Sequence, residues 1–260
     1  MKLCADDYGL NSEVSEGILN LLQKNKINSV SCLTTTKNWQ EQAKDLKAFL
    51  NKVEIGLHLS LTHPKPIYFP SSSLKQFIKK AYLGHLKKED LVKEIKAQIK
   101  AFSLQLGTRP NYIDGHEFCH HFPIIRSALR DVAKDFHFKK KNIYIRVFNP
   151  GKVPFFKNPI FYTFNHLASL PSKKLIKLLK SENLSFNERL LGFHPYCLEP
   201  KKYFNYYFQM KPTKKDIFFC HPGLLSQDSS DKLRFYRFKI YKFMMSEEFD
   251  KITSYYKLTV

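Results

Sequence analysis

The architecture of this chain can be inferred from one segment, Tyr112-Ile-Asp-Gly-His-Glu-Phe-Cys-His-His-Phe-Pro123. Its first two residues are typical of the end of a short strand, and Pro123 can open a helix with an apolar face. Between them lie two carboxylates and three imidazoles, which need partners when they are buried. α/β folds bind ligands where a strand leads into a helix. The segment therefore predicts a metal or catalytic site, with a structural hydrogen-bonded cluster as the alternative.

Predicted strands and helices alternate on both sides of this segment. The expected strands are Lys2–Ala5, Asn28–Thr35, Val53–Leu61, Tyr112–Asp114, Asn142–Phe148, Leu190–Phe193 and Asp216–Cys220. The expected helices are one capped by Ser12, then Trp39–Leu50, Leu74–Leu83, Lys87–Leu106, one from Pro123, Lys173–Leu179 and Lys232–Phe249. Residues 149–169 and 201–210 show no clear pattern. This alternation predicts one α/β domain over residues 1–260, with parallel strands and right-handed crossovers.

Composition limits the class of protein. The formal net charge is +20, from 43 basic and 23 acidic side chains, but only seven of the basic residues are arginine. Because nucleic-acid readers rely on arginine for bidentate contacts, nucleic acid is not expected as a partner. Scattered lysines on solvated faces are the main interpretation, and attraction to an anionic polymer or membrane surface is the alternative.

Cysteines and hydropathy indicate the compartment. The five cysteines form no CxxC pair, which favours reduced thiols. No 20-residue apolar run could span a bilayer, and the residues after Met1 do not resemble a signal peptide. These features predict a cytoplasmic protein without a transmembrane segment.

Polar residues lie at or near the ends of most predicted strands. They are Asp6, Asp7, His58, Asp114, His116, Arg146 and His221. In a (β/α) barrel the C-terminal ends of the strands meet at one mouth, so these side chains would come together. Two imidazoles and a carboxylate suit a divalent metal with open positions, and a second carboxylate and another histidine can move protons. The set predicts metal-assisted hydrolysis.

Four ordered motifs carry a resemblance to a known family. They are Ala-Asp6-Asp7-Tyr-Gly-Leu, Gly56-Leu-His58-Leu, Asp114-Gly-His116-x-x-x-His120-x-Phe-Pro123 and Cys220-His221-Pro. With them the chain resembles the YdjC/ChbG family of carbohydrate (chito-oligosaccharide) deacetylases, from residue 5 to about residue 240. Glu94, Gln98, Arg146 and Arg237 are further matches. The resemblance implies a distorted, TIM-like (β/α) barrel that removes acetyl groups from N-acetylglucosamine-type sugars.

The resemblance also implies roles for individual residues. Asp7, His58 and His116 match the ligands of one divalent metal ion, for which zinc and magnesium are the main candidates. Asp6 matches the general base and His221 the general acid. Residues expected to contact substrate or to orient the ligands are Asp114, His120, Arg146 and Arg237, with Asp114 expected to orient His116 or the turn. The family also implies a possible homodimer and an N-acetylated sugar or oligosaccharide as substrate.

Other readings of these residues stay open at this point. Asp6 and Asp7 could cap a helix, His58 could be a core histidine, and Arg146 could pair with a carboxylate. His121 is expected on the surface or in packing. Family members usually carry a histidine where this chain has Phe118, a departure that bears on sugar preference. The alternatives in function are a non-catalytic basic barrel that binds anionic polymers and a metal hydrolase that acts on a non-sugar amide or ester.

Overall fold

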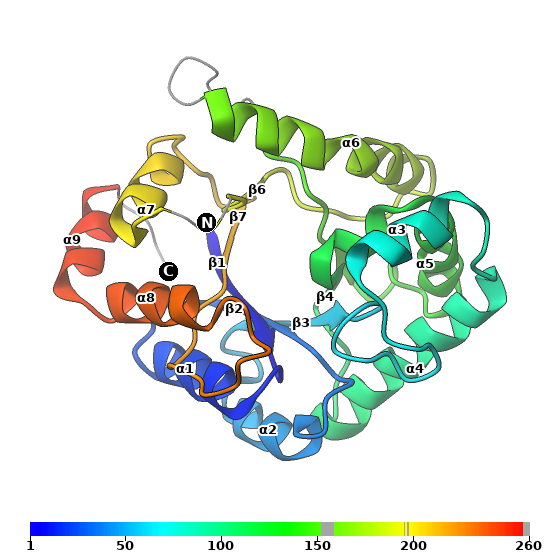
Figure 1. The fold of residues 1–260 in the computed structure, drawn as a ribbon, viewed down its shortest axis with the longest axis horizontal. Helices are drawn as coiled ribbons and strands as arrows, with labels where there is room; N and C mark the ends of the chain where they lie inside the picture. Colours follow the sequence, from blue (N-terminus) through cyan, green and yellow to red (C-terminus); the bar gives the residue numbers. More distant parts are fainter. Residues whose placement is uncertain (152–158, 195, 197, 257–260) are drawn as a thin grey trace.

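The computed structural model describes the chain except for residues 152–158, 195, 197 and 257–260. Seven parallel strands form one sheet in the order β5-β4-β3-β2-β1-β7-β6. Their bounds are β1 Lys2–Tyr8, β2 Ser29–Cys32, β3 Glu54–Leu59, β4 Tyr112–Gly115, β5 Tyr144–Ile145, β6 Leu190–Leu191 and β7 Ile217–Cys220. The prediction of a mostly parallel α/β barrel is confirmed, because the sheet curls into a distorted half-barrel (Figure 1).

Helices surround the curled sheet (Figure 1). They are α1 Ser12–Gln23, α2 Trp39–Leu46, η1 Lys47–Phe49, α3 Leu74–Tyr82, α4 Lys88–Leu106, η2 His116–His121, α5 Pro123–Asp135, α6 Pro159–Ser181, α7 Pro200–Phe208, α8 Arg234–Met244 and α9 Glu247–Tyr255. None of the described helices is long and apolar enough to cross a membrane.

Hydrogen bonds of an asparagine side chain and of the backbone bridge the gap between the two edges of the sheet. The amide of Asn187 accepts a hydrogen bond from Val147 N at 2.7 Å and donates one to Val147 O at 3.0 Å. Nearby, Leu190 N donates to Asn149 O at 2.8 Å. The side-chain amide thus satisfies both backbone groups of Val147, as a neighbouring strand would. These contacts bridge the two edges of the half-barrel, although β5 and β6 form no ladder with each other.

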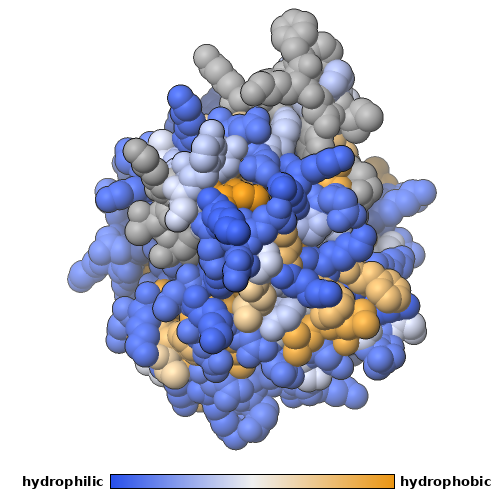
Figure 2. Space-filling view, turned by 90° about the vertical axis from the view of Figure 1, so that its left-hand side faces the viewer, coloured by the Kyte–Doolittle hydropathy of each residue, from blue (hydrophilic) through white to orange (hydrophobic). Residues whose placement is uncertain are grey.

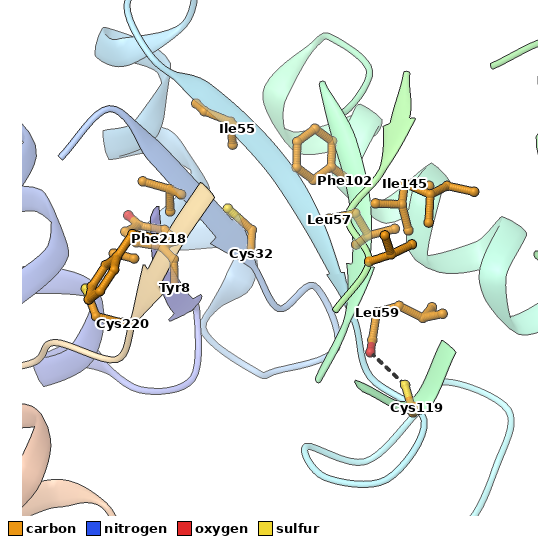
Figure 3. Packing of buried hydrophobic residues seen from close by; sticks show 14 of the residues in the cluster. Tyr8, Cys32, Ile55, Leu57, Leu59, Phe102, Cys119, Ile145, Phe218 and Cys220 are labelled. Carbon is orange, nitrogen blue, oxygen red and sulfur yellow. Dashed lines mark hydrogen bonds between the residues drawn. The ribbon is translucent and has the colours of Figure 1, made fainter. Parts of the chain in front are cut away.

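Alternate residues of the strands face the helices and the barrel interior. On β3, Ile55, Leu57 and Leu59 belong to the large core between sheet and helices, where the Cys119 thiol donates to Leu59 O at 3.5 Å (Figure 3). Gly56 faces inward, and a β-carbon there would lie 2.3 Å from the ring of Tyr112. The glycine therefore makes room for an aromatic layer that fills the barrel below the site. This layer comprises Cys4, Tyr112, Phe148, Leu190, Ile217 and Phe219.

Several predicted boundaries were wrong. The strand from Lys2 continues to Tyr8, and Asn11, whose side chain accepts from Val14 N, caps α1 in place of Ser12. The long helix predicted over Lys232–Phe249 is two helices, because Ser246 interrupts it and caps α9.

Parts of two stretches without a clear pattern are helical, while residues 152–158 of the first lie outside the described residues. Helix α6 begins at Pro159 rather than near Lys173, and residues 200–208 form α7.

Candidate metal centre

Three donor atoms converge at the C-terminal ends of β1, β3 and β4. His116 Nδ1 lies 3.0 Å from Asp7 Oδ1, and His58 Nε2 lies 3.3 Å from each of these two atoms. The Asp7 and His58 side chains are buried, whereas 18% of the His116 side chain is exposed. Tetrahedral ligands at bond lengths of about 2.0–2.1 Å lie about 3.3 Å apart. The donor set and its spacing therefore fit one divalent cation, with a side open to solvent.

A bulge in β1 directs two neighbouring carboxylates inward. The register against β2 shifts between Ala5 and Tyr8, and Asp7 has a φ of 72°. Ala5 and Tyr8 both pack in the outer core, although an unbroken strand would place them on opposite faces. The extra residue lets Asp6 and Asp7 both face the barrel interior. The sequence alone could not show which of the two carboxylates faces the metal site.

Asp114 fixes the ring of His58. Its Oδ1 lies 3.0 Å from His58 Nδ1 and accepts a hydrogen bond from Ser31 Oγ at 2.6 Å. His58 and Asp114 are direct register partners on β3 and β4, so Asp114 orients His58, whereas the prediction was His116 or the turn. With Nδ1 donating to Asp114, the lone pair of Nε2 points toward Asp7 and His116.

The surrounding carboxylates favour a positive charge at this place. Burial alone would lower the pKa of His58, but Asp114 and the hydrogen bonds to Asp114 and Asp7 raise it to about 10. The same potential that holds a proton here attracts a metal cation.

Arg146 binds two buried carboxylates behind the ligands. Its Nη1 and Nη2 donate to the two oxygens of Asp6 at 2.7 and 2.6 Å, and Nη2 also contacts Asp114. Asp6, His58 and Asp114 are close enough to suggest a second metal group. The guanidinium already supplies the cation there, which favours the group of Asp7, His58 and His116 as the candidate metal centre and leaves Asp6 beside it.

Arg237 leaves one oxygen of Asp7 for a metal. Its Nη2 donates to Asp7 Oδ2 at 2.8 Å, and its Nε donates to Asp231 Oδ2 at 3.0 Å. Burial alone would raise the pKa of Asp7, but Arg237 and His116 hold it well below its usual range. Asp7 is therefore ionised at neutral pH and presents Oδ1 to the cluster.

His221 follows β7 and faces the same mouth. Its Nε2 lies 4.0 Å from Asp7 Oδ2, and 11% of its side chain is exposed. The rings of Tyr196 and Phe219 stand edge-on to it, with centroids at 5.6 and 5.5 Å. Burial lowers the pKa of His221 to about 4, so its imidazole is neutral at neutral pH.

The other histidines of the cluster serve the fold. His120 Nε2 lies 2.8 Å from Arg146 O, which places this ring behind the loop that carries Arg146. His121 is buried, stacks on Phe118 and accepts from Phe148 N at 3.3 Å, so the packing alternative applies to it. Phe118 has a φ of 54° and also stacks on Phe148. These residues turn the chain between β4 and α5.

A long loop beside the site is tied down by α4. Buried Glu94 accepts from Ile67 N at 2.9 Å and Tyr68 N at 2.6 Å. Gln98 bonds both backbone groups of Ser60 and also donates to Glu94. At the near end of the loop, Thr62 Oγ1 donates to Glu117 Oε2 at 2.7 Å, next to His116. The family matches Glu94 and Gln98 thus hold the rim of the site.

Sequence reasoning missed three residues of this region. Only their contacts in the structure identify Ser31, Glu117 and Tyr196 as part of this region. A serine on a strand or a tyrosine in a loop has no distinguishing sequence pattern. Glu117 was the most accessible to prediction, because it follows His116 directly.

Fold and site together define an α/β half-barrel protein with an Asp-His-His candidate metal centre at the C-terminal ends of its strands. The model of the YdjC-like protein family matches residues 1–254, and the chain belongs to that family. The family resemblance seen in the motifs is confirmed.

Relatives carry deacetylase names. The chain is 25% identical over 207 residues to a carbohydrate deacetylase of Clostridium beijerinckii, covering 76% of this chain and 81% of that protein. It is 27% identical over 137 residues to a chitooligosaccharide deacetylase of Serratia marcescens, covering 50% of this chain and 54% of the relative. A carbohydrate deacetylase of Danio rerio is 27% identical over 146 residues, which are 50% of this chain and 45% of that protein. Two of these three matches thus span about half of the relative.

A solved structure shares the fold. It is an Enterococcus faecalis protein described as a proposed cellobiose-phosphate cleavage protein. The two chains are 18% identical, with a TM-score of 0.72 over 100% of this chain and 95% of the other. At this identity the likeness concerns the fold alone.

Proposed function

We propose that this protein is a metal-dependent hydrolase that removes acetyl groups from N-acetylglucosamine-type sugars or oligosaccharides. The observation that carries the proposal is the convergence of Asp7 Oδ1, His58 Nε2 and His116 Nδ1 within 3.3 Å of one another. Asp6 has an oxygen within 4.8 Å of a His58 ring nitrogen, and His221 Nε2 lies 4.0 Å from Asp7 Oδ2, which supports them as the proton carriers. The names of the relatives supply the substrate class.

Asp7, His58 and His116 would hold one divalent cation. When bound, the cation polarises the amide carbonyl and lowers the pKa of the attacking water. Two imidazoles and one carboxylate favour zinc or a similar transition metal over magnesium, which prefers oxygen ligands. Arg237 keeps the ligand Asp7 ionised and oriented.

Asp6 and His221 move the protons. Asp6 takes a proton from the water as its oxygen bonds to the acetyl carbon, and the bidentate contact with Arg146 fixes this carboxylate. His221 delivers a proton to the amine nitrogen as the C–N bond breaks. Because burial holds the pKa of His221 near 4, the ring is neutral at rest. It takes the second proton of the attacking water from the hydroxyl of the tetrahedral intermediate and passes this proton to the amine. Acetate and a free amino sugar result.

Acetate release from N-acetylglucosamine oligomers tests the proposal. The proteins to compare are the wild type, Asp6→Asn, His116→Ala and the control His85→Ala, which alters an exposed histidine outside the site. Each is assayed after chelation and after addition of zinc, magnesium, nickel or cobalt. We expect both site variants to lose at least about 100-fold in kcat, because each removes a group needed in the transition state. His116→Ala should also bind less metal, while Asp6→Asn keeps it.

The outcomes separate the rival functions. If the protein binds metal stoichiometrically but releases no acetate, the metal site is supported and the sugar amide is rejected as substrate. The substrate would then be a non-sugar amide or an ester. The enzyme hypothesis would be rejected if the protein neither binds metal nor releases acetate. Salt-dependent polyanion binding that Asp6→Asn leaves unchanged would then support a non-catalytic binding protein.

The proposal extends to the whole chain. We treat residues 1–260 as one catalytic domain that works in the cytoplasm. The cysteines that the structure describes, Cys4, Cys32, Cys119 and Cys220, are free and buried, which suits a reducing compartment. A homodimer is the assembly that the family implies, and light scattering of the purified protein tests it.

A further inference from the structure

An aromatic cluster after β6 stands next to His221. The ring of Tyr196 lies edge-on to the rings of His221 and Tyr236, with centroids at 5.6 Å in both cases. His194 packs against both tyrosines at 5.0 and 5.1 Å. Tyr196 therefore approaches the mouth of the barrel from the side of β6, where neither the metal ligands nor the proposed proton carriers are attached.

Hydrogen bonds of His194 fix the position of Tyr196. The backbone N of Tyr196 donates to His194 Nδ1 at 2.9 Å, so the ring proton of His194 is on Nε2, which donates to the Tyr236 hydroxyl at 2.7 Å. Burial lowers the pKa of His194 to about 3, which agrees with a neutral ring. Tyr196 has a φ of 56°, a conformation that needs outside support in a residue other than glycine. This support holds the side chain in one place.

The ring of Tyr196 contacts His221, and its phenol lies within electrostatic range of the charges around the candidate metal centre. Burial raises its pKa, and the charged groups that act on it are Asp7, Arg237, Asp6 and Glu117. The phenol is therefore protonated at neutral pH and can donate. Among the described residues, no group accepts a hydrogen bond from it. Arg237 Nη1, buried nearby, likewise has no hydrogen-bond partner in the described part of the chain.

We propose that Tyr196 is a catalytic residue whose hydroxyl donates a hydrogen bond to the acetyl oxygen of the substrate. The inference rests on the proposed function. As water attacks, the C=O electrons move onto that oxygen, and a fixed donor stabilises the charge that develops there. The phenol keeps its proton throughout, so the protons of water still go to Asp6 and, through His221, to the amine. When the C–N bond breaks, the Tyr196 hydroxyl still donates its hydrogen bond to the same oxygen, which now belongs to acetate.

Tyr196→Phe tests this role. We expect kcat to fall about 10- to 100-fold, as on removal of one oxyanion donor, with KM changed less than about threefold. Acetate should bind the zinc-loaded variant about tenfold more weakly by calorimetry, because the same hydrogen bond is lost. The matched control is Tyr241→Phe, which removes a half-buried hydroxyl on α8 that contacts Asn20. It should match the wild type in both measurements.

The two measurements distinguish failures. If the wild type releases no acetate from sugars, the proposed function fails. The comparison of acetate affinity between wild type and Tyr196→Phe still tests whether Tyr196 donates to this oxygen. Equal acetate binding by wild type and Tyr196→Phe, including equal absence of binding, would overturn the proposal. So would a variant with the kcat of the wild type. A lower kcat accompanied by a lower melting temperature than that of Tyr241→Phe would point to a purely structural role.

Discussion

Two adjacent carboxylates, Asp6 and Asp7, differ in the guanidinium that each one binds. Arg146 takes both oxygens of Asp6, whereas Arg237 takes one oxygen of Asp7 and leaves the other facing His58 and His116. Burying such charges is costly unless they are paired, so the arginines also make the site compatible with a folded core. The pairing gives neighbouring residues of one strand different surroundings, which agrees with the proposed roles of Asp6 as base and Asp7 as ligand.

Asp114 offers a direct test of ligand orientation. Asp114→Asn keeps the shape and can still accept from Ser31, but it removes the charge that supports His58 and Arg146. We expect zinc affinity to fall about 10- to 100-fold, as for other carboxylates behind a metal-bound histidine. Competition with a chromophoric chelator measures it. Asp135→Asn, an exposed ion-pair partner of Lys96, is the control. Equal zinc affinity of Asp114→Asn and wild type would show that Asp114 does not orient the ligand.

The sequence allowed the candidate ligands to be predicted but not all of their partners. Asp7, His58 and His116 lie in motifs at strand ends, which parallel topology brings to one mouth, although Asp7 also needs the bulge in β1 to face inward. That Asp114 bonds His58 depends on the register of β3 against β4, which no local pattern encodes. The proposed role of Tyr196 depends on contacts between loops, which the sequence does not show.

Elements were predictable where their periodicity was strong. Helix α4 has a continuous apolar stripe and ends at Gly107, and its predicted bounds differ from the observed ones by one residue. Helix α6 contains Pro171 and a face that includes exposed Leu167, which obscured its amphipathic pattern. Strands β5 and β6 have two residues each and depend on tertiary contacts.

Glu94 connects helix α4 to the loop that borders the site. Glu94→Gln replaces one of the two acceptor oxygens by a donor that faces a backbone N–H group. We expect the free energy of unfolding to fall by about 1–3 kcal/mol, the cost of a buried unsatisfied donor, and KM for oligosaccharides to rise. Urea unfolding and steady-state kinetics measure these changes. Glu89→Gln, an exposed change on the same helix, should alter neither value; a similar loss in both variants would refute the loop contact.

At the scale of the molecule, the charge of +20 is spread out. Several lysines pair with carboxylates of other elements, among them Lys134 with Glu182, Lys201 with Glu248 and Lys239 with Glu199. The face on the side of α7, α8 and α9 is mostly hydrophilic, with apolar groups between the polar ones (Figure 2). This arrangement supports the interpretation of solvated lysine-rich faces.

Buried neutral histidines should make the fold sensitive to acid. Burial lowers the pKa of His194 to about 3 and that of His120 to about 4, below the value near 6.5 of an unfolded chain. The unfolded state therefore binds protons first, and stability present above pH 6.5 is lost as the pH falls toward 4. Each histidine contributes a slope of about 1.4 kcal/mol per pH unit in this window.

Urea unfolding of the metal-free protein at pH 7, 6 and 5 measures this slope. In His194→Asn the side-chain oxygen can still accept from Tyr196 N, but the titrating ring is gone. The slope of this variant should be shallower by about 1.4 kcal/mol per pH unit, whatever its absolute stability. Identical slopes in the two proteins would mean that His194 is not held neutral.

The position of β1 between β2 and β7 also governs how the molecule can be made. On the ribosome, Asp6 and Asp7 emerge within the first strand, but one edge of that strand lacks its partner until Ile217–Cys220 has been synthesised, some 200 residues later. Arg237, which neutralises Asp7, comes later still. Until these segments are synthesised, β1 has one unpaired edge and Asp7 cannot reach its buried, paired state. We therefore expect this topology to make the nascent chain dependent on chaperones during synthesis, whereas the stability of the finished fold is not affected.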